Sequence, residues 1–161
     1  MKKYLLLSLF GFCIGVSLKA QTFTDNFDSY TSGSKLGPQS IKWTTWSGND
    51  GGADDALVVS TDAHSGANSL YLSSTNTSGG SSDIILPFGG EYNTGQFTFQ
   101  AWFKIPNNKT AYFNLQGNDT TGKQWSLNCN MNADSSIYFY DANGAVFIKF
   151  ILRYSTCTCL S

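Results

Sequence analysis

Side chains that could support acid–base catalysis are few in this sequence of 161 residues. It contains one Glu, Glu91, and one His, His64. Glycosidases generally need two carboxylates that flank the scissile bond, and the adjacent pair Asp54 and Asp55 would point to opposite faces of a strand. With a single Glu, the sequence also contains no clustered E-x-D-x-E strand. We therefore expect a protein that is not an enzyme.

One acidic segment has side chains suited to calcium. Residues 49–55 read N-D-G-G-A-D-D, so that Asp50, Asp54 and Asp55 supply hard oxygen ligands in a glycine-containing loop. Their spacing does not match the EF-hand pattern. Because Asp, Asn and Gly are also ordinary turn formers, a solvated acidic loop is the alternative interpretation of this weak calcium site.

Aromatic and amide side chains are the more informative group. The segments 96–105, 111–116, 124–131 and 136–141 alternate between apolar and polar residues. Side chains at i and i+2 share one face of a strand, so a meander of these segments would have one apolar and one polar face. Trp125 falls on the apolar face in this alternation, with Leu127. The polar face would gather Gln100, Trp102, Tyr112, Asn114, Gln116, Asn128, Tyr138 and Tyr140.

Such a face suits a neutral sugar. Tyr and Trp combine a large apolar ring with a polar group, and amides can pair with sugar hydroxyls. Cross-strand neighbours on one face lie about 4.5–5.5 Å apart. We therefore expect Trp102 and Tyr112 to stack on a neutral glycan, with Gln100, Asn114 and Gln116 as hydrogen-bonding groups. Trp46 and Tyr92 are the next candidates, and a solvated face of a structural or adhesive domain is the alternative.

The elements that position these residues are nearly all strands. Further short candidates are 22–27, 41–47, 56–60, 68–73, 83–86 and 146–154, separated by turns rich in Gly, Asn and Ser. This spacing predicts an all-β antiparallel two-sheet sandwich, or jelly roll. Its core would contain Phe97, Phe99, Phe103, Phe113, Leu115, Leu127 and Phe139.

Three segments carry a resemblance to a known family. They are 23–30 (F-x-D-x-F-D-S-Y), 64–71 (H-S-G-A-N-S-L-Y) and 97–106 (F-x-F-x-A-W-F-x-I-P). In this order they resemble secreted concanavalin A-like and carbohydrate-binding jelly rolls. The resemblance implies a two-sheet jelly roll used for glycan binding or as a non-catalytic module of surface proteins. It also implies a second location for calcium, near Asp25 and Asp28.

The N-terminus has the pattern of a secretory signal peptide. Lys2 and Lys3 precede an apolar run over 5–16, and Ala20 ends the segment. The run is shorter than the ~20 residues of a membrane span, so we expect no membrane span after cleavage and a secreted or extracellular location. Removal of residues 1–20 leaves 7 basic and 11 acidic residues, a net charge of −4. This balance argues against nucleic acid and leaves a neutral glycan or cell-surface polysaccharide as the expected partner.

The remaining chain divides into a sandwich domain over 21–147 and an atypical tail over 148–161. The tail loses the earlier Gly- and Asn-rich alternation, and it is either an incomplete last strand of a truncated domain or a genuine one. Cys129, Cys157 and Cys159 remain after signal removal. Because their number is odd, one thiol stays free or pairs with another chain, and the sequence leaves the pairing open.

Overall fold

The computed structural model describes residues 23–73, 82–90, 95–118, 120–151 and 158–160. The expected signal peptide, Glu91 and Tyr92 lie outside the described residues. The described chain contains strands and one short 3-10 turn, Gly37–Gln39, and no α-helix. The strands are β1 (Thr44–Thr45), β2 (Leu57–Val59), β3 (Ser69–Tyr71), β4 (Ile84–Ile85), β5 (Ala101–Phe103), β6 (Ala111–Gln116), β7 (Trp125–Met131), β8 (Ser136–Asp141), β9 (Val146–Ile151) and β10 (Thr158–Leu160).

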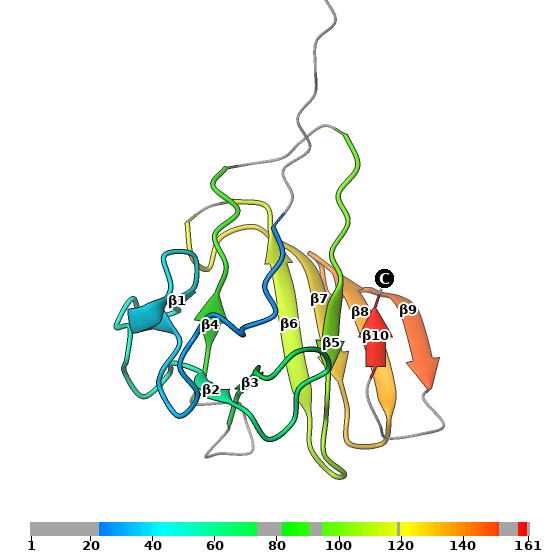
Figure 1. Ribbon diagram of the computed structural model, residues 1–161. Helices are drawn as coiled ribbons and strands as arrows, with labels where there is room; N and C mark the ends of the chain where they lie inside the picture. Colours follow the sequence, from blue (N-terminus) through cyan, green and yellow to red (C-terminus); the bar gives the residue numbers. More distant parts are fainter. Residues whose placement is uncertain (1–22, 74–81, 91–94, 119, 152–157, 161) are drawn as a thin grey trace, which may run out of the picture.

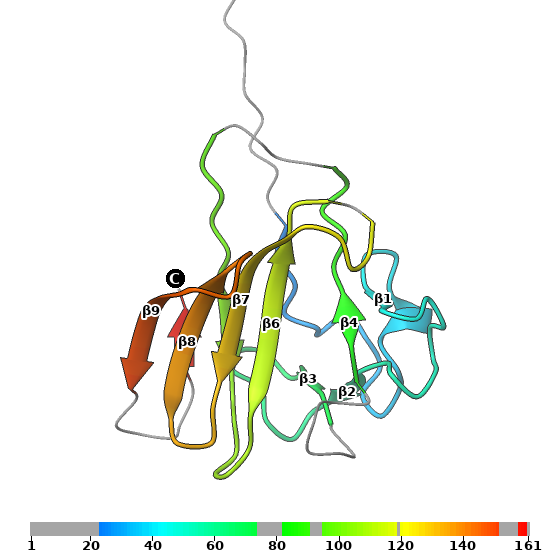
Figure 2. The ribbon, with the colours of Figure 1, turned by 180° about the vertical axis from the view of Figure 1, so that it is seen from behind.

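The strands form antiparallel sheets, which confirms the all-β class. The largest sheet has the order β6-β7-β8-β9, and three two-stranded sheets pair β1 with β4, β2 with β3, and β5 with β10. Figures 1 and 2 show β6 to β9 side by side, with β5 and β10 across one face of that sheet and β1 to β4 beyond β6.

Polar turns hold the register of the four-stranded meander. Between β8 and β9, the Asp141 carboxylate accepts the backbone N–H groups of Asn143 and Ala145 at 2.8 and 2.9 Å. Gly144 in this turn has φ +80°, a conformation that favours glycine. Between β7 and β8, the N–H of Asn132 donates to the carbonyl of Ser136 at 2.8 Å. These short connections make β7 a neighbour of β8, and β8 a neighbour of β9.

The inner face of the meander packs into a core of its own. Cys129, Met131 and Ile137 are buried there, and the rings of Phe103 and Phe113 stack with centroids 5.5 Å apart. Six of the seven expected core residues are half-buried. Phe97 is the exception: its side chain is 53 % exposed, because the strand expected over 96–105 is confined to Ala101–Phe103.

A second core lies under the N-terminal sheets. Leu36, Ala56 and Val58 are fully buried, and half-buried side chains that include Trp43 and Leu70 pack against them. The core predicted from the second half of the sequence therefore accounts for only one of two clusters. The short β-branched segment 56–60 and Leu36, which lies just before the 3-10 turn, build the other.

The segment 22–27 is not a strand where it is described. The Asp25 carboxylate accepts the N–H of Phe27 at 2.8 Å, and Phe27 has φ +64°. The same carboxylate accepts the Tyr30 hydroxyl at 2.9 Å and the Trp43 indole N–H at 3.0 Å. A short acidic side chain that bonds to nearby backbone competes with strand pairing, so this segment forms a turn braced by two aromatic residues.

Two of the segments that carry the family resemblance fit together. The Asp28 carboxylate accepts the backbone N–H groups of Ala67 and Asn68 at 2.7 and 2.9 Å. The Asn68 side chain in turn donates to the carbonyls of Phe27 and Tyr30 at 3.2 and 2.9 Å. Gly66 lies directly against Asp28, where a Cβ would be 1.9 Å from Oδ2. The two segments therefore form one polar contact, which we call the Asp28–Gly66 lock.

The tail takes part in two sheets. β9 extends to Ile151 and pairs with β8, so the boundary expected at residue 147 falls inside this strand. β10 pairs antiparallel with β5 through Thr158 and Phe103, and through Leu160 and Ala101. The described part of the tail therefore pairs with two different sheets, through β9 with β8 and through β10 with β5.

Candidate functional site

The outer face of β6, β7 and β8 gathers amide and aromatic side chains in two cross-strand rows. One row joins Asn114, Asn128 and Tyr140, and the other joins Tyr112, Asn130 and Tyr138. Directly paired residues share a face, and each of these residues alternates with one that faces the core. Figure 2 views the sheet from this side, and no described strand crosses in front of it. We call these six residues together with Gln116 the outer face.

Hydrogen bonds hold the β6 part of the outer face. The Tyr112 hydroxyl donates to Asn128 Oδ1 at 2.7 Å, and Gln116 Nε2 donates to Asn114 Oδ1 at 3.1 Å. Burial raises the pKa of Tyr112, and the negative charge of Asp83 acts in the same direction. The hydroxyl therefore stays protonated at neutral pH. Its ring remains 51 % exposed, so an anchored aromatic surface is open to a ligand.

The β8 part of the outer face carries two stacked tyrosine rings. Tyr138 and Tyr140 lie with ring centroids 6.1 Å apart and planes at 21°. Lys149 from β9 places its Nζ 4.9 Å from the centroid of Tyr138, and hydrogen bonding with Tyr138 raises the pKa of Lys149. Lys149 lies in the segment 148–161, which is expected to be a separate tail, so it is not among the residues predicted for the site. Lys149 is the polar residue in the otherwise apolar strand β9, and this is the sequence signal that would have identified it.

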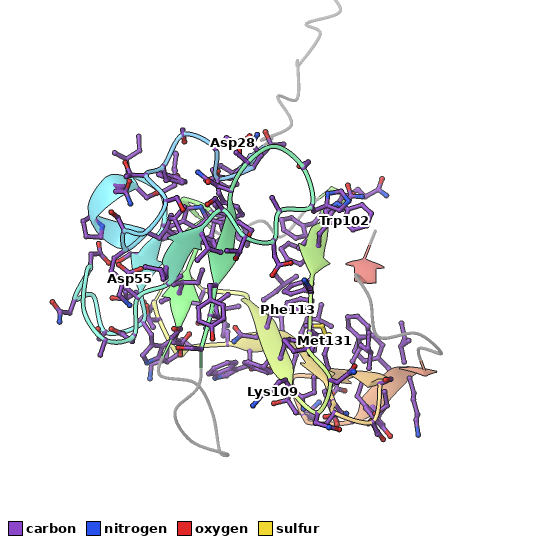
Figure 3. The ribbon with its side chains drawn as sticks, turned by 60° about the horizontal axis from the view of Figure 1, so that its bottom comes forward. Asp28, Asp55, Trp102, Lys109, Phe113 and Met131 are labelled. Atoms are coloured by element: carbon purple, nitrogen blue, oxygen red, sulfur yellow. The ribbon has the colours of Figure 1, made fainter. Side chains whose placement is uncertain are left out.

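The structure does not bring Trp102 and Gln100 to the outer face. β5 pairs with β10, not with β6. Because Phe103 of β5 stacks on Phe113 of β6, the alternate residues Trp102 and Tyr112 project away from each other. Figure 3 shows Trp102 on the side of β5 away from Phe113. The expectation that the five predicted ligand contacts share one surface is therefore corrected.

Trp102 instead belongs to a surface formed with the loop after β2. Its indole stacks on the His64 ring with centroids 3.6 Å apart and planes at 15°, and it is 47 % exposed. On the same side of β5, Lys104 forms an ion pair with Asp62. Gln100 is exposed just before β5. Side-chain contacts of Trp102 and Lys104 thus hold the loop against β5.

The three aspartates of the expected calcium site act separately as acceptors for backbone donors. Asp55 is 1 % exposed and accepts the N–H groups of Gly37 and Gly51 at 2.9 and 2.8 Å. Asp50 accepts the N–H of Thr45 at 2.9 Å. Asp54 accepts the N–H of Ser47 at 3.2 Å, and hydrogen bonding with Ser47 lowers the pKa of Asp54.

No three acidic, His or Cys side chains converge closely enough to hold a metal ion in the part of the chain that the structure describes. Figure 3 shows Asp55 within the N-terminal loops, away from Phe113 and Trp102. The calcium interpretation therefore lacks the convergent ligand set on which it rested. The density of Asp and Gly in 49–55 reflects turn formation there.

Comparison with models of known protein families, with curated proteins and with solved structures gives no match. The resemblance to concanavalin A-like jelly rolls therefore remains a hypothesis that rests on the three sequence segments. Among the described residues, no helix is long and apolar enough to cross a membrane.

Proposed function

We propose that this chain is a secreted, non-catalytic carbohydrate-binding domain and that its outer face binds a neutral glycan. The observation that carries the proposal is the pairing of amide and tyrosine side chains in cross-strand rows on a sheet face that no described strand covers. Tyrosine rings offer apolar surface to the C–H faces of sugars. Amides between the rings offer both donors and acceptors to hydroxyl groups.

The chemistry of the outer face favours a neutral ligand. Its seven members carry no formal charge, and burial raises the pKa of Tyr112, which keeps the hydroxyl neutral. The cation next to this face is Lys149, and its Nζ lies over the Tyr138 ring. An open, uncharged surface of this kind gains little from long-range electrostatic attraction. Recognition would rest on stacking and on hydrogen bonds.

We extend the proposal to the architecture. The ring contacts of Phe113 with Phe99 at 5.1 Å and with Phe103 at 5.5 Å support a layer formed by β5 and β10 over the inner face of the meander. A two-sheet jelly roll would arise if this layer continues through the N-terminal sheets. In that architecture the outer face of β6 to β8 is the solvent-facing side of one sheet, where a polymer at the cell surface can lie.

The proposal is tested by glycan binding of the purified protein and two tyrosine variants. Neutral oligosaccharides are screened on an array, and hits are measured by calorimetry. Tyr112→Ala should weaken binding about three- to tenfold, the equivalent of one aromatic contact. Tyr71→Ala is the matched control, because Tyr71 is similarly exposed, at 56 %, but lies on β3. Equal binding by both variants, or no binding by the wild-type protein, would contradict the proposal.

An association domain without a small ligand is the second candidate. β9 is the last strand in the order of its sheet, and its residues Val146, Phe147 and Ile148 are 49 %, 54 % and 41 % exposed. An apolar edge strand is a template for pairing with another chain. Concentration-dependent self-association that Phe147→Lys abolishes, together with no glycan binding, would favour this candidate.

A further inference from the structure

One irregularity in the ladder between β6 and β7 changes the direction of Trp125. Leu115 pairs with Leu127, but the next β6 residue, Gln116, pairs with Trp125. Ser126 is therefore an extra residue in β7, and such a bulge shifts the alternation of the strand beyond it. Trp125 lies opposite Gln116 on the outer side, and it is absent from the side chains packed around Cys129.

A second indole packs on Trp125 from the N-terminal half of the chain. Trp46, directly after β1, stacks on it with ring centroids 5.9 Å apart and planes at 29°. The backbone N–H of Trp46 donates to the Asp83 carbonyl at 2.9 Å, which fixes this residue beside β4. Trp46 is 37 % exposed. Two indoles from distant segments thus form one aromatic surface, the Trp46–Trp125 pair.

The loop between β6 and β7 is shaped around this pair. Gly122 has φ +79°, and a Cβ at this position would lie 3.3 Å from Cζ2 of Trp46. The N–H of Gly122 donates to Gln116 Oε1 at 2.9 Å. Gln116 also bonds to Asn114 through its Nε2. One glutamine side chain therefore joins the indole pair to the amides of the outer face.

The two aromatic positions are separated along β6. Tyr112 and Gln116 are four residues apart on the strand, a rise of about 13 Å, and Asn114 lies between them on the same face. This separation exceeds the length of one sugar ring. A single monosaccharide could therefore contact either Tyr112 or the Trp46–Trp125 pair, whereas a chain along β6 could contact both.

We propose that the Trp46–Trp125 pair is a second stacking position of the glycan site, and that the ligand is an extended, unbranched β-linked chain. This inference rests on the proposed glycan binding. An open sheet face fits a flat chain whose rings expose C–H surfaces, such as a β-1,4-linked hexose polymer, better than a coiled one. Tyr112 and the Trp46–Trp125 pair could each stack on one sugar ring, and the amide of Asn114 between them could bond to the rings that link the two. Each further ring binds as a tethered ligand at high effective concentration.

A length series of neutral oligosaccharides tests the inference. The probes are β-1,4-linked oligomers of glucose, mannose and xylose with two to six units, measured by calorimetry and by tryptophan fluorescence. The wild-type affinity should rise with chain length. Trp46→Ala should weaken binding of the longest ligand roughly three- to tenfold and remove most of the gain with length. Trp46→Tyr, which keeps an aromatic ring, should restore much of that gain.

Trp102→Ala is the matched control, because Trp102 is a similarly exposed indole on the other side of the molecule. Circular dichroism confirms that each variant is folded, and Trp46→Leu, which keeps an apolar side chain without an aromatic ring, replaces Trp46→Ala if that variant does not fold. If the wild-type protein binds but the folded variant without an aromatic ring at position 46 binds the longest ligand as tightly, only the second stacking position is wrong. If the wild-type protein binds no oligomer of any length, the proposed glycan binding fails and this inference fails with it.

Discussion

Substitution of Gly66 by Ala should weaken the fold through the Asp28–Gly66 lock. Gly66 has φ +70°, and an added Cβ would lie 1.9 Å from Asp28 Oδ2. The left-handed conformation itself costs an L-residue about 1–2 kcal/mol. The clash adds a second cost, because the Asp28 carboxylate must move away from the N–H groups of Ala67 and Asn68. Asp28 is exposed, so we expect about 1 kcal/mol for each of these bonds at most.

Substitution of a second glycine, Gly33, separates the cost of the left-handed conformation from the cost of the clash with Asp28. Gly33 has φ +84°, and a Cβ there would meet nothing within 4 Å. Gly33→Ala therefore carries the conformational cost alone. In urea denaturation followed by tryptophan fluorescence, Gly66→Ala should lower the free energy of unfolding by about 1–2 kcal/mol more than Gly33→Ala does.

The double variant completes the test. In an Asp28→Ala background the lock is already lost, so Gly66→Ala should cost no more than Gly33→Ala costs in the same background. The reasoning is refuted if Gly66→Ala and Gly33→Ala destabilise the wild-type protein equally, because the close approach to Asp28 would then carry no energy.

Three further perturbations have expected outcomes. Asp55→Ala should destabilise the protein by about 2 kcal/mol, because the buried N–H of Gly37 and the more exposed N–H of Gly51 lose their acceptor. EDTA should leave the wild-type melting temperature unchanged, and a drop that Ca²⁺ reverses would restore the calcium interpretation. Burial raises the pKa of Cys129 from 9.0 to about 11, so the protonated thiol stabilises the fold fully below pH 9, and this stabilisation is lost as the pH rises to 11. Over this range the wild-type protein should lose up to about 2 kcal/mol more of its free energy of unfolding than Cys129→Ala does. Equal losses in denaturation measurements would exclude a contribution of the buried thiol to the pH dependence. Trp102→Ala should lower the free energy of unfolding by about 1 kcal/mol, because the stack with His64 is lost, and it should leave glycan binding unchanged. Loss of binding by the folded variant in calorimetry would show that Trp102 belongs to the glycan site.

The strands β6 and β8 could be predicted from the sequence because their apolar and polar residues alternate with a period of two. The expected segment 111–116 coincides with β6, and 136–141 coincides with β8. Alternation sets which side chains share a face. It therefore placed Tyr112, Asn114, Asn128, Tyr138 and Tyr140 correctly relative to the core.

The same alternation does not say which strands are neighbours. Phe103 and Phe113 would share an apolar face in a hairpin, and they also face each other when β5 lies across the inner side of β6. Only the hairpin would place Trp102 beside Tyr112, as the sequence predicts. Pairing of β5 with β10 depends on residues more than 50 positions apart. Short-range patterns carry no information on such a contact.

Irregularities of a single residue within a strand could not be predicted from the alternation either. The extra residue at Ser126 moves Trp125 to the outer side, although its alternation with Leu127 predicts the core. The turn at Asp25 likewise replaces an expected strand, because a carboxylate bonds to the N–H of Phe27. The close spacing of Asp25, Asn26 and Asp28 is a sequence signal for such a turn, whereas nothing in the residues around Ser126 marks the bulge.

A titration of isotope-labelled protein with a neutral β-linked oligosaccharide, followed by NMR, tests the central claim most directly. The side-chain amides of Asn114, Gln116 and Asn128 report on the outer face, and the indole N–H of Trp102 reports on the opposite side within the same sample. Saturable shifts of the three amides, with an unchanged Trp102 signal, are the predicted result. Shifts confined to Trp102 and His64, or no shifts with any neutral glycan, would contradict the account.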